Sequence, residues 1–193
     1  MECKVGILAF QGDFYEHQEA LSSLGVSSVF VKSLENLENL THLILPGGES
    51  TVIAKFLEST GLGKEIQKRG KEQSLQIYGS CAGSILLANR VESKVPLSTL
   101  ELIDVKVSRN AYGSQIHSFE ADSELISTQE KFKAVFIRAP KILEIAQNVQ
   151  VLAKYEGEII AAEKDNIMIS TFHPELICPV IFHKYFLQKR VQI

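Results

Sequence analysis

The stretch LQIYGSCAGSILLANRV, residues 75–91, decides the fold, because the chain changes there from one type of secondary structure to another. Its first part, LQIYGS (75–80), is a short and mostly apolar run that predicts a strand. Its last part, AGSILLANRV (82–91), predicts a helix. Cys81 lies at the junction, on the turn between the two elements. Its position allows two interpretations, a nucleophile or a small core side chain.

Small residues surround this cysteine. Gly79 and Gly83 flank Cys81 in GSCAG, which is the cysteine form of the G-x-S-x-G nucleophile elbow. Bulky neighbours would collide with so sharp a turn, and the N-terminus of the following helix would favour the thiolate. The alternative is a buried structural cysteine, the commoner fate of a free thiol. A nucleophile would in addition need a base and a group that orients the base.

Outward from this stretch, apolar runs alternate with helical patterns in the first half of the chain. We expect strands at 4–10, 27–32 and 41–48, and helices at 13–25 and 49–61. This alternation predicts βαβ units and a parallel sheet with helices on both faces. The second half contains several short strands and a final helix at 174–191, and its turns indicate hairpins. We therefore predict one α/β domain over residues 1–193, with three α/β/α layers and a mixed, mostly parallel, flavodoxin-like sheet.

The composition excludes several classes of partner. Of the 193 residues, 45% are hydrophobic and 22% are charged, and the net charge of −3 gives no reason to expect a nucleic acid or an anionic membrane surface. No stretch approaches the roughly 20 apolar residues of a membrane span, and the N-terminal apolar run is too short for a signal sequence. The three cysteines have no CxxC spacing, so we expect no disulfide framework and no metal site. The expected location is the cytoplasm.

A base and an orienting acid stand close together near the end of the chain. In STFHPEL (170–176), His173 and Glu175 are two residues apart and follow an apolar run. Pro174 between them keeps the segment extended, so the two side chains project to the same side. Glu175 can then hold the ring of His173 while the other ring nitrogen meets Cys81. The alternative is an ordinary helix start in which Glu175 serves the helix dipole.

A glycine pair ends the predicted strand at 41–48. In LPGGES (45–50), Gly47 and Gly48 would let backbone N–H groups approach a ligand or form an oxyanion hole, and Glu49 and Ser50 could contact a polar substrate. The alternative is an ordinary glycine-rich turn with capping residues. All three features lie at carboxyl ends of strands, where α/β sheets place their ligands. Together they predict a cysteine hydrolase with an oxyanion site.

These motifs also carry a family resemblance. The order PGGES, GSCAG, FHPE resembles the class I glutamine amidotransferases, and longer blocks resemble the glutaminase subunits of pyridoxal 5'-phosphate synthase. The longer blocks are GILAFQGDFYEH (6–17), LPGGEST (45–51), SRNAYGSQIHSFE (108–120), VFIRAP (135–140) and STFHPEL (170–176). They span nearly the whole chain. The resemblance implies the class I glutamine amidotransferase fold.

The resemblance also implies roles for single residues. They are Cys81, His173 and Glu175 as the catalytic triad; Gly47, Gly48, Glu49, Ala82, Arg109, Ile137 and Arg138 as the glutamine and oxyanion site; and Gln11 as a residue of a loop near the site and the partner interface. The implied reaction is hydrolysis of L-glutamine to L-glutamate and ammonia without a cofactor. The ammonia would pass to a separate TIM-barrel synthase subunit.

The chain departs from the family pattern at a few positions. Ser80 stands where threonine is usual, Ser84 where a larger apolar residue is usual, Tyr112 where phenylalanine is usual and Ser114 where arginine is usual. Two other functions stay open: a glutaminase for another acceptor, such as imidazole glycerol phosphate synthase, or a non-catalytic binding protein of the same fold. We expect His17 at the surface or an interface, and His183 exposed.

Overall fold

A central sheet of seven strands organises the computed structural model, which describes residues 3–109, 118–177 and 179–189. The strands lie in the order β10 (Gln150–Tyr155), β11 (Glu158–Lys164), β12 (Ile167–Ser170), β4 (Gln76–Ser80), β3 (His42–Leu45), β1 (Val5–Leu8) and β2 (Ser28–Val31). From β12 to β2 all neighbours pair in parallel, and β10 and β11 extend the sheet by antiparallel pairing. The mixed, mostly parallel sheet is as predicted.

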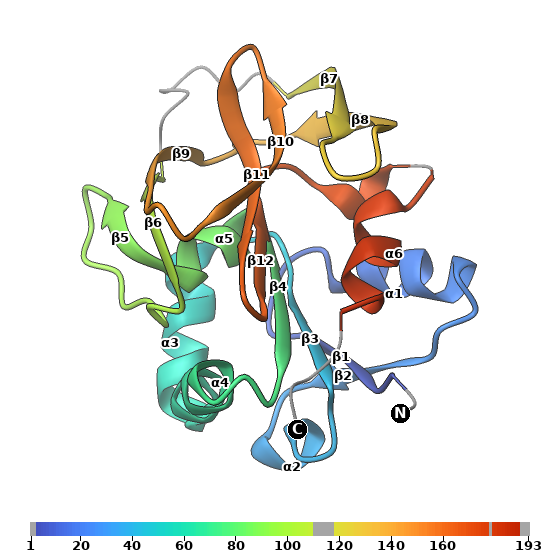
Figure 1. Ribbon diagram of the computed structural model, residues 1–193. Coiled ribbons are helices and arrows are strands. Elements are labelled where there is room, and N and C mark those ends of the chain that lie inside the picture. Colours follow the sequence, from blue (N-terminus) through green and yellow to red (C-terminus); the bar gives the residue numbers. More distant parts are fainter. Residues whose placement is uncertain (1–2, 110–117, 178, 190–193) are drawn as a thin grey trace.

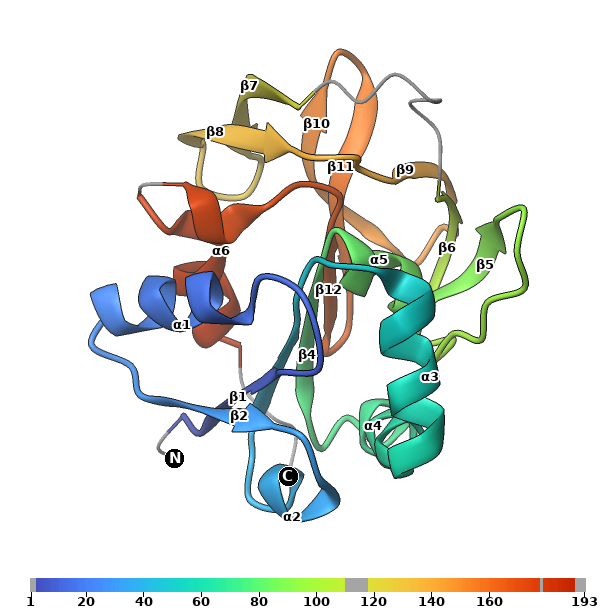
Figure 2. The ribbon, with the colours of Figure 1, turned by 180° about the vertical axis from the view of Figure 1, so that it is seen from behind.

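Helices cover both faces of this sheet (Figure 1 and Figure 2). One face carries α1 (Phe14–Ser23) and α6 (Ile181–Leu187), and the other carries α3 (Ser50–Thr60), α4 (Leu62–Lys71) and α5 (Ala82–Leu87). The short helix α2 (Leu34–Leu37) lies between β2 and β3. Among the described residues, no helix is both long enough and apolar enough to cross a bilayer. The three-layer arrangement confirms the predicted fold class.

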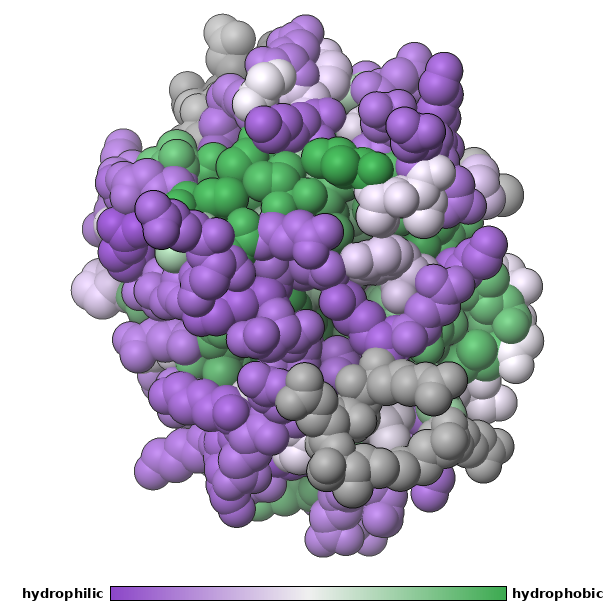
Figure 3. Space-filling view, in the orientation of Figure 1, coloured by the Kyte–Doolittle hydropathy of each residue, from purple (hydrophilic) through white to green (hydrophobic). Residues whose placement is uncertain are grey.

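The core lies on the two sides of the sheet, because neighbouring residues of a strand point to opposite faces. In β1, Ile7 belongs to the apolar cluster under α1 and α6, whereas Leu8 belongs to the cluster under α3, α4 and α5. In β3, Ile44 and Leu43 divide in the same way. Both faces of these strands are therefore buried, which explains their nearly continuous apolar sequences. Hydrophilic side chains cover most of the face shown in Figure 3, and a smaller apolar area lies near its top.

Smaller sheets surround the carboxyl ends of the central parallel strands. One consists of β5 (Ala88–Glu92), β6 (Ile103–Ser108) and β9 (Lys141–Ile145), and the other is the hairpin of β7 (Phe119–Leu125) and β8 (Glu130–Phe136). The hairpin is attached to the chain after β12, because the amide of His173 donates a hydrogen bond to the carbonyl of Val135 (2.8 Å). The second half is thus rich in hairpins, as predicted.

Two of the predicted helices have different ends in the structure. The helix expected at 82–91 ends at Leu87, and the chain continues directly as β5, because these residues pair in parallel with β6. Pairing with a neighbouring strand overrides local helix propensity. The helix expected at 174–191 is divided into a 3₁₀ turn, η1 (Pro174–Leu176), and α6. Pro179 explains the division, because it has no N–H to donate and restricts the residue before it.

Candidate active site

The turn between β4 and α5 holds Cys81 in a strained backbone conformation. Its φ of 45° and ψ of −104° lie in a region that non-glycine residues rarely adopt. A Cβ atom on Gly83 would lie 2.1 Å from the carbonyl oxygen of Leu45, and one on Gly79 would lie 2.5 Å from the carbonyl carbon of Gly83. Both contacts are with backbone, which cannot easily move away. The two glycines therefore meet the steric requirement that the sequence pattern implied.

The serine that departs from the family pattern is accommodated within this turn. Ser84 is completely buried, and its hydroxyl donates a hydrogen bond to the carbonyl oxygen of Cys81 (2.6 Å). The amide of Ser84 approaches the same oxygen (3.1 Å). The polar side chain thus has a partner despite its burial, and that partner belongs to the cysteine itself.

His173 and Glu175 lie beside this turn, just after β12. Nδ1 of His173 lies 2.7 Å from Oε1 of Glu175 and 3.3 Å from Oδ2 of Asp13. The carboxylate of Glu175 is fully buried. Nε2 of His173 is buried and has no hydrogen-bond partner of good geometry among the described residues, while Sγ of Cys81 is directed at the carbonyl oxygen of Ile137 (3.9 Å). The acid thus orients one ring nitrogen and leaves the other available.

The surroundings of His173 favour its protonated form. Burial lowers the pKa of the ring, but the nearby Asp13, Cys81 and Glu175 outweigh burial and raise the pKa of His173 from 6.5 to about 12. Burial raises the pKa of Glu175, and the hydrogen bond from His173 opposes that rise. An imidazolium between carboxylates and a thiol is therefore the form that this geometry stabilises.

The glycine pair after β3 forms one wall of the site. Gly48 has a φ of 144°, and a Cβ atom there would lie 2.7 Å from the side-chain oxygen of Gln11. That same oxygen accepts a hydrogen bond from the amide of Glu49 (2.6 Å). Gly47 lies against the ring of His173, since a Cβ atom on it would be 2.6 Å from Cε1 of His173. The loop after β1, through Gln11, thus fixes the loop after β3.

These residues share one cavity of about 680 Å³. Of the residues predicted from the sequence, its lining includes Gln11, Gly48, Glu49, Cys81, Ala82, Arg109, Ile137, Arg138 and His173. Gly47 and Glu175 lie behind this lining, against His173. The cavity is also lined by Asp13, Ile85, Ser118 and Pro140, which the sequence analysis did not single out. Asp13 could have been found, because it follows Gln11 in a loop at the carboxyl end of a parallel strand.

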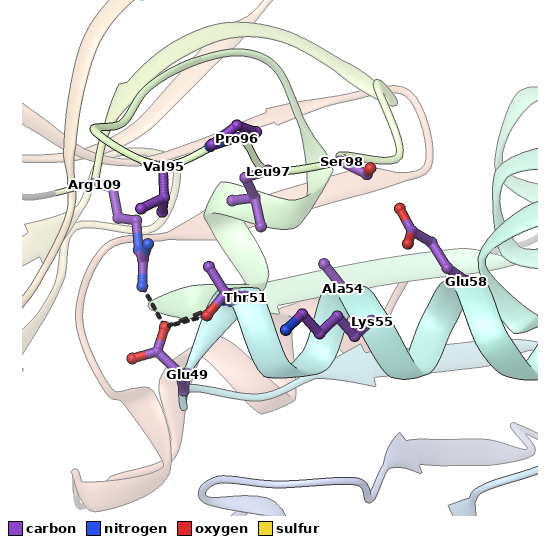
Figure 4. Close-up of a pocket in the computed structure, with 10 residues that line it drawn as sticks. All are labelled: Glu49, Thr51, Ala54, Lys55, Glu58, Val95, Pro96, Leu97, Ser98 and Arg109. Atoms are coloured by element: carbon purple, nitrogen blue, oxygen red, sulfur yellow. Dashed lines mark hydrogen bonds and ion pairs between the residues drawn. The ribbon is translucent and has the colours of Figure 1, made fainter.

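An ion pair stands at the edge of this cavity. Nη2 of Arg109 contacts Oε1 of Glu49, which also accepts a hydrogen bond from the hydroxyl of Thr51 (3.0 Å). Figure 4 shows Arg109 reaching down to Glu49 at the start of α3. A second cavity of about 520 Å³ lies on the other side of this pair, which lines both cavities. Residues 110–117, with the predicted departures at Tyr112 and Ser114, lie outside the described part of the chain, as does Cys178.

The positions expected for His17 and His183 are wrong. Both side chains are fully buried, and Nδ1 of His17 lies 2.8 Å from Nε2 of His183. Nε2 of His17 lies 3.0 Å from the hydroxyl of Ser80 and 3.2 Å from Oε2 of Glu175. A buried carboxylate requires polar neighbours, and α1 and α6 supply them from the same face of the sheet. The sequence did not reveal these contacts, because the two helices are far apart in the sequence.

Among the described residues, one group has ligand atoms close enough together to suggest a metal site. It consists of Asp13, His173 and Glu175, whose ligand atoms lie within 4.8 Å of one another. Both carboxylates approach the same atom, Nδ1 of His173. A cation would have to displace the hydrogen bonds that orient the ring. The arrangement therefore suits a proton on the imidazole, and the expected absence of a metal stays a prediction.

Comparison with known proteins identifies the family of the chain. The model of the SNO glutamine amidotransferase family matches residues 7–192. The chain is 47% identical over 189 residues to the pyridoxal 5'-phosphate synthase subunit PdxT of Clostridium beijerinckii, covering 97% of this chain and 98% of that protein. It is 45% identical over 184 residues to the protein of that name from Pseudothermotoga lettingae, covering 95% of this chain and 94% of the relative.

Solved structures lead to the same family. A crystal structure described as a glutamine amidotransferase has a TM-score of 0.91 at 42% identity and covers 95% of this chain and 97% of its own. PurLQS from Thermotoga maritima has a TM-score of 0.70 at 18% identity, covering 91% of this chain and 89% of its own, and so shares the fold. With the match over nearly its full length, the chain belongs to the SNO glutamine amidotransferase family.

Proposed function

We propose that this protein is the glutaminase subunit of a pyridoxal 5'-phosphate synthase, which hydrolyses L-glutamine to L-glutamate and ammonia. One observation carries the proposal: the strained Cys81 and the ring of His173, oriented by Glu175, line one cavity. Family membership and the names of relatives that are 44–47% identical to the chain support the same activity. A non-catalytic role would not require a cysteine held at positive φ beside a buried histidine–glutamate pair.

The reaction begins with attack by sulfur. Cys81 reacts as the thiolate, with its proton held on Nε2 of His173; Sγ bonds to the side-chain amide carbon of glutamine, and the carbonyl π electrons move to oxygen. Nε2–H of His173 protonates the amide nitrogen, the C–N bond breaks, and ammonia leaves a thioester on Cys81. His173 then takes a proton from water, which attacks the thioester and releases glutamate. Glu175 holds Nδ1–H throughout, so that Nε2 always faces the reacting atoms.

The negative oxygen of each tetrahedral intermediate requires hydrogen-bond donors. We assign this role to the backbone N–H groups of Gly48 and Ala82, two residues that line the same cavity as Cys81. Removing one such donor in a hydrolase typically costs about 100- to 1,000-fold in kcat. Gln11 contributes indirectly, because its hydrogen bond with the amide of Glu49 fixes the loop that carries Gly48.

The charged end of glutamine requires partners of both signs. Arg109 and Arg138 offer positive charge for the α-carboxylate, and Glu49 offers negative charge for the α-ammonium. Ile137 lines the same cavity beside Arg138, whose backbone has a φ of 47°. We propose that these four residues bind the substrate and place its amide at Cys81.

The ammonia has a separate destination in this proposal. The partner is the TIM-barrel synthase subunit, which receives the ammonia directly, and the loop with Gln11 lies at the interface. The location is the cytoplasm. The names of the relatives, which identify them as subunits of a synthase, support the existence of such a partner.

The test is the release of glutamate and ammonia by the purified protein, alone and with the synthase subunit. We expect hydrolysis that the partner stimulates, and none by the C81A variant in the same complex. Absence of hydrolysis by the wild-type complex, or full hydrolysis by C81A, would overturn the proposal.

A further inference from the structure

A chain of buried polar groups continues behind the proposed triad, away from the cavity. His17 on α1, Ser80 at the end of β4 and His183 on α6 have no exposed surface. Nε2 of His17 lies 3.0 Å from the hydroxyl of Ser80 and 3.2 Å from Oε2 of Glu175. Nδ1 of His17 lies 2.8 Å from Nε2 of His183. Three elements thus supply the polar groups of this chain, and His17 connects it to Glu175.

The second carboxylate oxygen of Glu175 is the reason to expect a role for this chain. Oε1 is bonded to the ring of His173 (2.7 Å). Oε2 is buried and has no well-aligned donor among the described residues, and the nitrogen 3.2 Å from it is Nε2 of His17. A carboxylate oxygen without a donor in such a place is costly. A small rotation of the His17 ring would align its N–H with Oε2.

Counting protons gives one consistent arrangement. If Nε2 of His17 carries the hydrogen, Nδ1 is an acceptor and must receive the Nε2–H of His183 (2.8 Å). Nδ1 of His183 is then a bare acceptor, which agrees with its having no hydrogen-bond partner among the residues that the structure describes. The opposite tautomer of His17 would aim a lone pair at the carboxylate. The geometry therefore favours two neutral rings with the hydrogen of His17 facing Glu175.

We propose that His17 is a positioning residue for the catalytic triad: its Nε2–H holds Oε2 of Glu175, and His183 fixes the ring of His17 in the tautomer that does so. This inference rests on the proposed function, because it acts through Glu175 on His173. Under this proposal, α1 and α6 contribute residues that support the triad from behind without contacting the substrate. The family usually has threonine at position 80. Threonine also carries a hydroxyl, which could lie near Nε2 of His17 as the hydroxyl of Ser80 does.

The electrostatic surroundings agree with neutral rings. Burial, followed by the charges of His183 and His173, lowers the pKa of His17 well below 6.5. Burial lowers the pKa of His183 to about 4. The other titratable groups that face this chain are Glu175, Asp13 beyond it and Tyr78 from β4, whose phenol bonds to the hydroxyl of Ser170 (2.9 Å). Burial raises the pKa of Tyr78, so it too stays neutral.

The first test needs no variant. In protein labelled with ¹⁵N-histidine and assembled with the synthase subunit, the ring nitrogen shifts separate protonated from bare nitrogens. We expect His17 and His183 each to carry hydrogen on Nε2 alone, without titration between about pH 6 and 8. A His17 hydrogen on Nδ1, or titration of His17 in this range, would overturn the proposal.

The second test measures catalysis in the same complex. In H17L the donor is lost and the volume is nearly kept, whereas in H17Q an N–H donor is retained. We expect kcat of H17L to fall about 10- to 100-fold with KM within about twofold, which is the scale of losing an outer-layer partner, and H17Q to recover most of that loss. The matched control is H42L, because His42 is also buried but bonds to Cys3 and the carbonyl of Lys189.

The outcomes separate this inference from the function on which it rests. A wild-type complex that does not hydrolyse glutamine contradicts the proposed function. Suppose instead that the wild-type complex hydrolyses glutamine. If H17L is then as active as wild type, or if H42L loses as much kcat as H17L, only the role of His17 is contradicted. If H17L does not fold, the nitrogen shifts of the wild-type protein decide the question.

Discussion

At the scale of single residues, the site depends on where a Cβ atom is absent. Cys81 can hold a φ of 45° because Gly79 and Gly83 let the turn pack closely against Leu45. This feature could be predicted from the sequence, because a cysteine on a sharp turn between a strand and a helix needs small neighbours, and GSCAG provides them. The hydrogen bond from Ser84 to Cys81 could not be predicted, because it depends on the rotamer of Ser84. The sequence shows only that a serine stands where the family usually has a larger apolar residue.

The first prediction concerns the G83A variant. Its added methyl group would lie 2.1 Å from a backbone oxygen, so the turn or β3 must shift. We expect a loss of about 3 kcal/mol in the free energy of unfolding, measured by urea titration. The control is G25A, because Gly25 has a φ of 73° and open space around it, and should lose only about 1 kcal/mol. Equal losses in the two variants would contradict the steric account of the elbow.

At the scale of elements, the site is assembled where parallel strands end. The loops after β1, β3, β4 and β12 carry Gln11, Gly48, Cys81 and His173, and one cavity joins them. The sequence predicted this meeting, because carboxyl ends of parallel strands share one edge. It did not reveal α4, half of whose ten residues are charged, or the end of α5 at Leu87, which strand pairing decides.

The second prediction concerns the loop before α3. In R109Q the ion pair with Glu49 is lost and the residue no longer offers positive charge to the substrate. We expect KM for glutamine to rise about tenfold, the equivalent of about 1.4 kcal/mol. Stability should change by less than about 1 kcal/mol, because the side chain of Glu49 is 49% exposed. Steady-state glutaminase kinetics in the complex and urea titration measure the two effects.

A matched variant provides the control for this measurement. Arg90 forms an ion pair with Glu144 (2.9 Å), and neither residue lines the cavity. R90Q should leave KM unchanged. If R90Q raised KM as much as R109Q, the effect would be one of general surface charge, and the substrate-binding role of Arg109 would be wrong.

At the scale of the whole molecule, two helices from opposite ends of the chain meet behind the site. His17 and His183 are 166 residues apart and 2.8 Å from each other. Neither residue has a sequence neighbour that indicates this contact. Their burial follows from how α1 and α6 pack on one face of the sheet, so residue patterns alone predicted them at the surface. Only the folded chain shows that His17 lies beside Glu175 and that His183 contacts His17.

The third prediction concerns the stability of the whole fold in acid. Burial lowers the pKa of His183 from 6.5 to about 4. Between these values the unfolded chain binds a proton that the folded chain does not, so stability is lost as the pH falls. The contribution of His183 is about 3 kcal/mol over this range. Burial of His17 acts in the same direction, whereas the raised pKa of Glu175 acts in the opposite one.

The H183L variant isolates this contribution. We expect the difference in unfolding free energy between wild type and H183L to shift by about 3 kcal/mol in favour of the variant between about pH 7 and 4. Urea titrations at several pH values measure it. A difference that does not depend on pH would show that His183 takes up its proton equally well in the folded chain.

The account stands on Cys81 as the nucleophile activated beside His173, and an electrophilic glutamine analogue tests this most directly. The wild-type complex is incubated with the analogue, digested and analysed by mass spectrometry, with C81A and H173N in parallel. We predict one adduct, on Cys81 rather than Cys3 or Cys178, that glutamine suppresses and that forms at least about 100-fold more slowly in H173N. An unmodified Cys81 in a complex that hydrolyses glutamine, or labelling equally fast in H173N, would contradict the account.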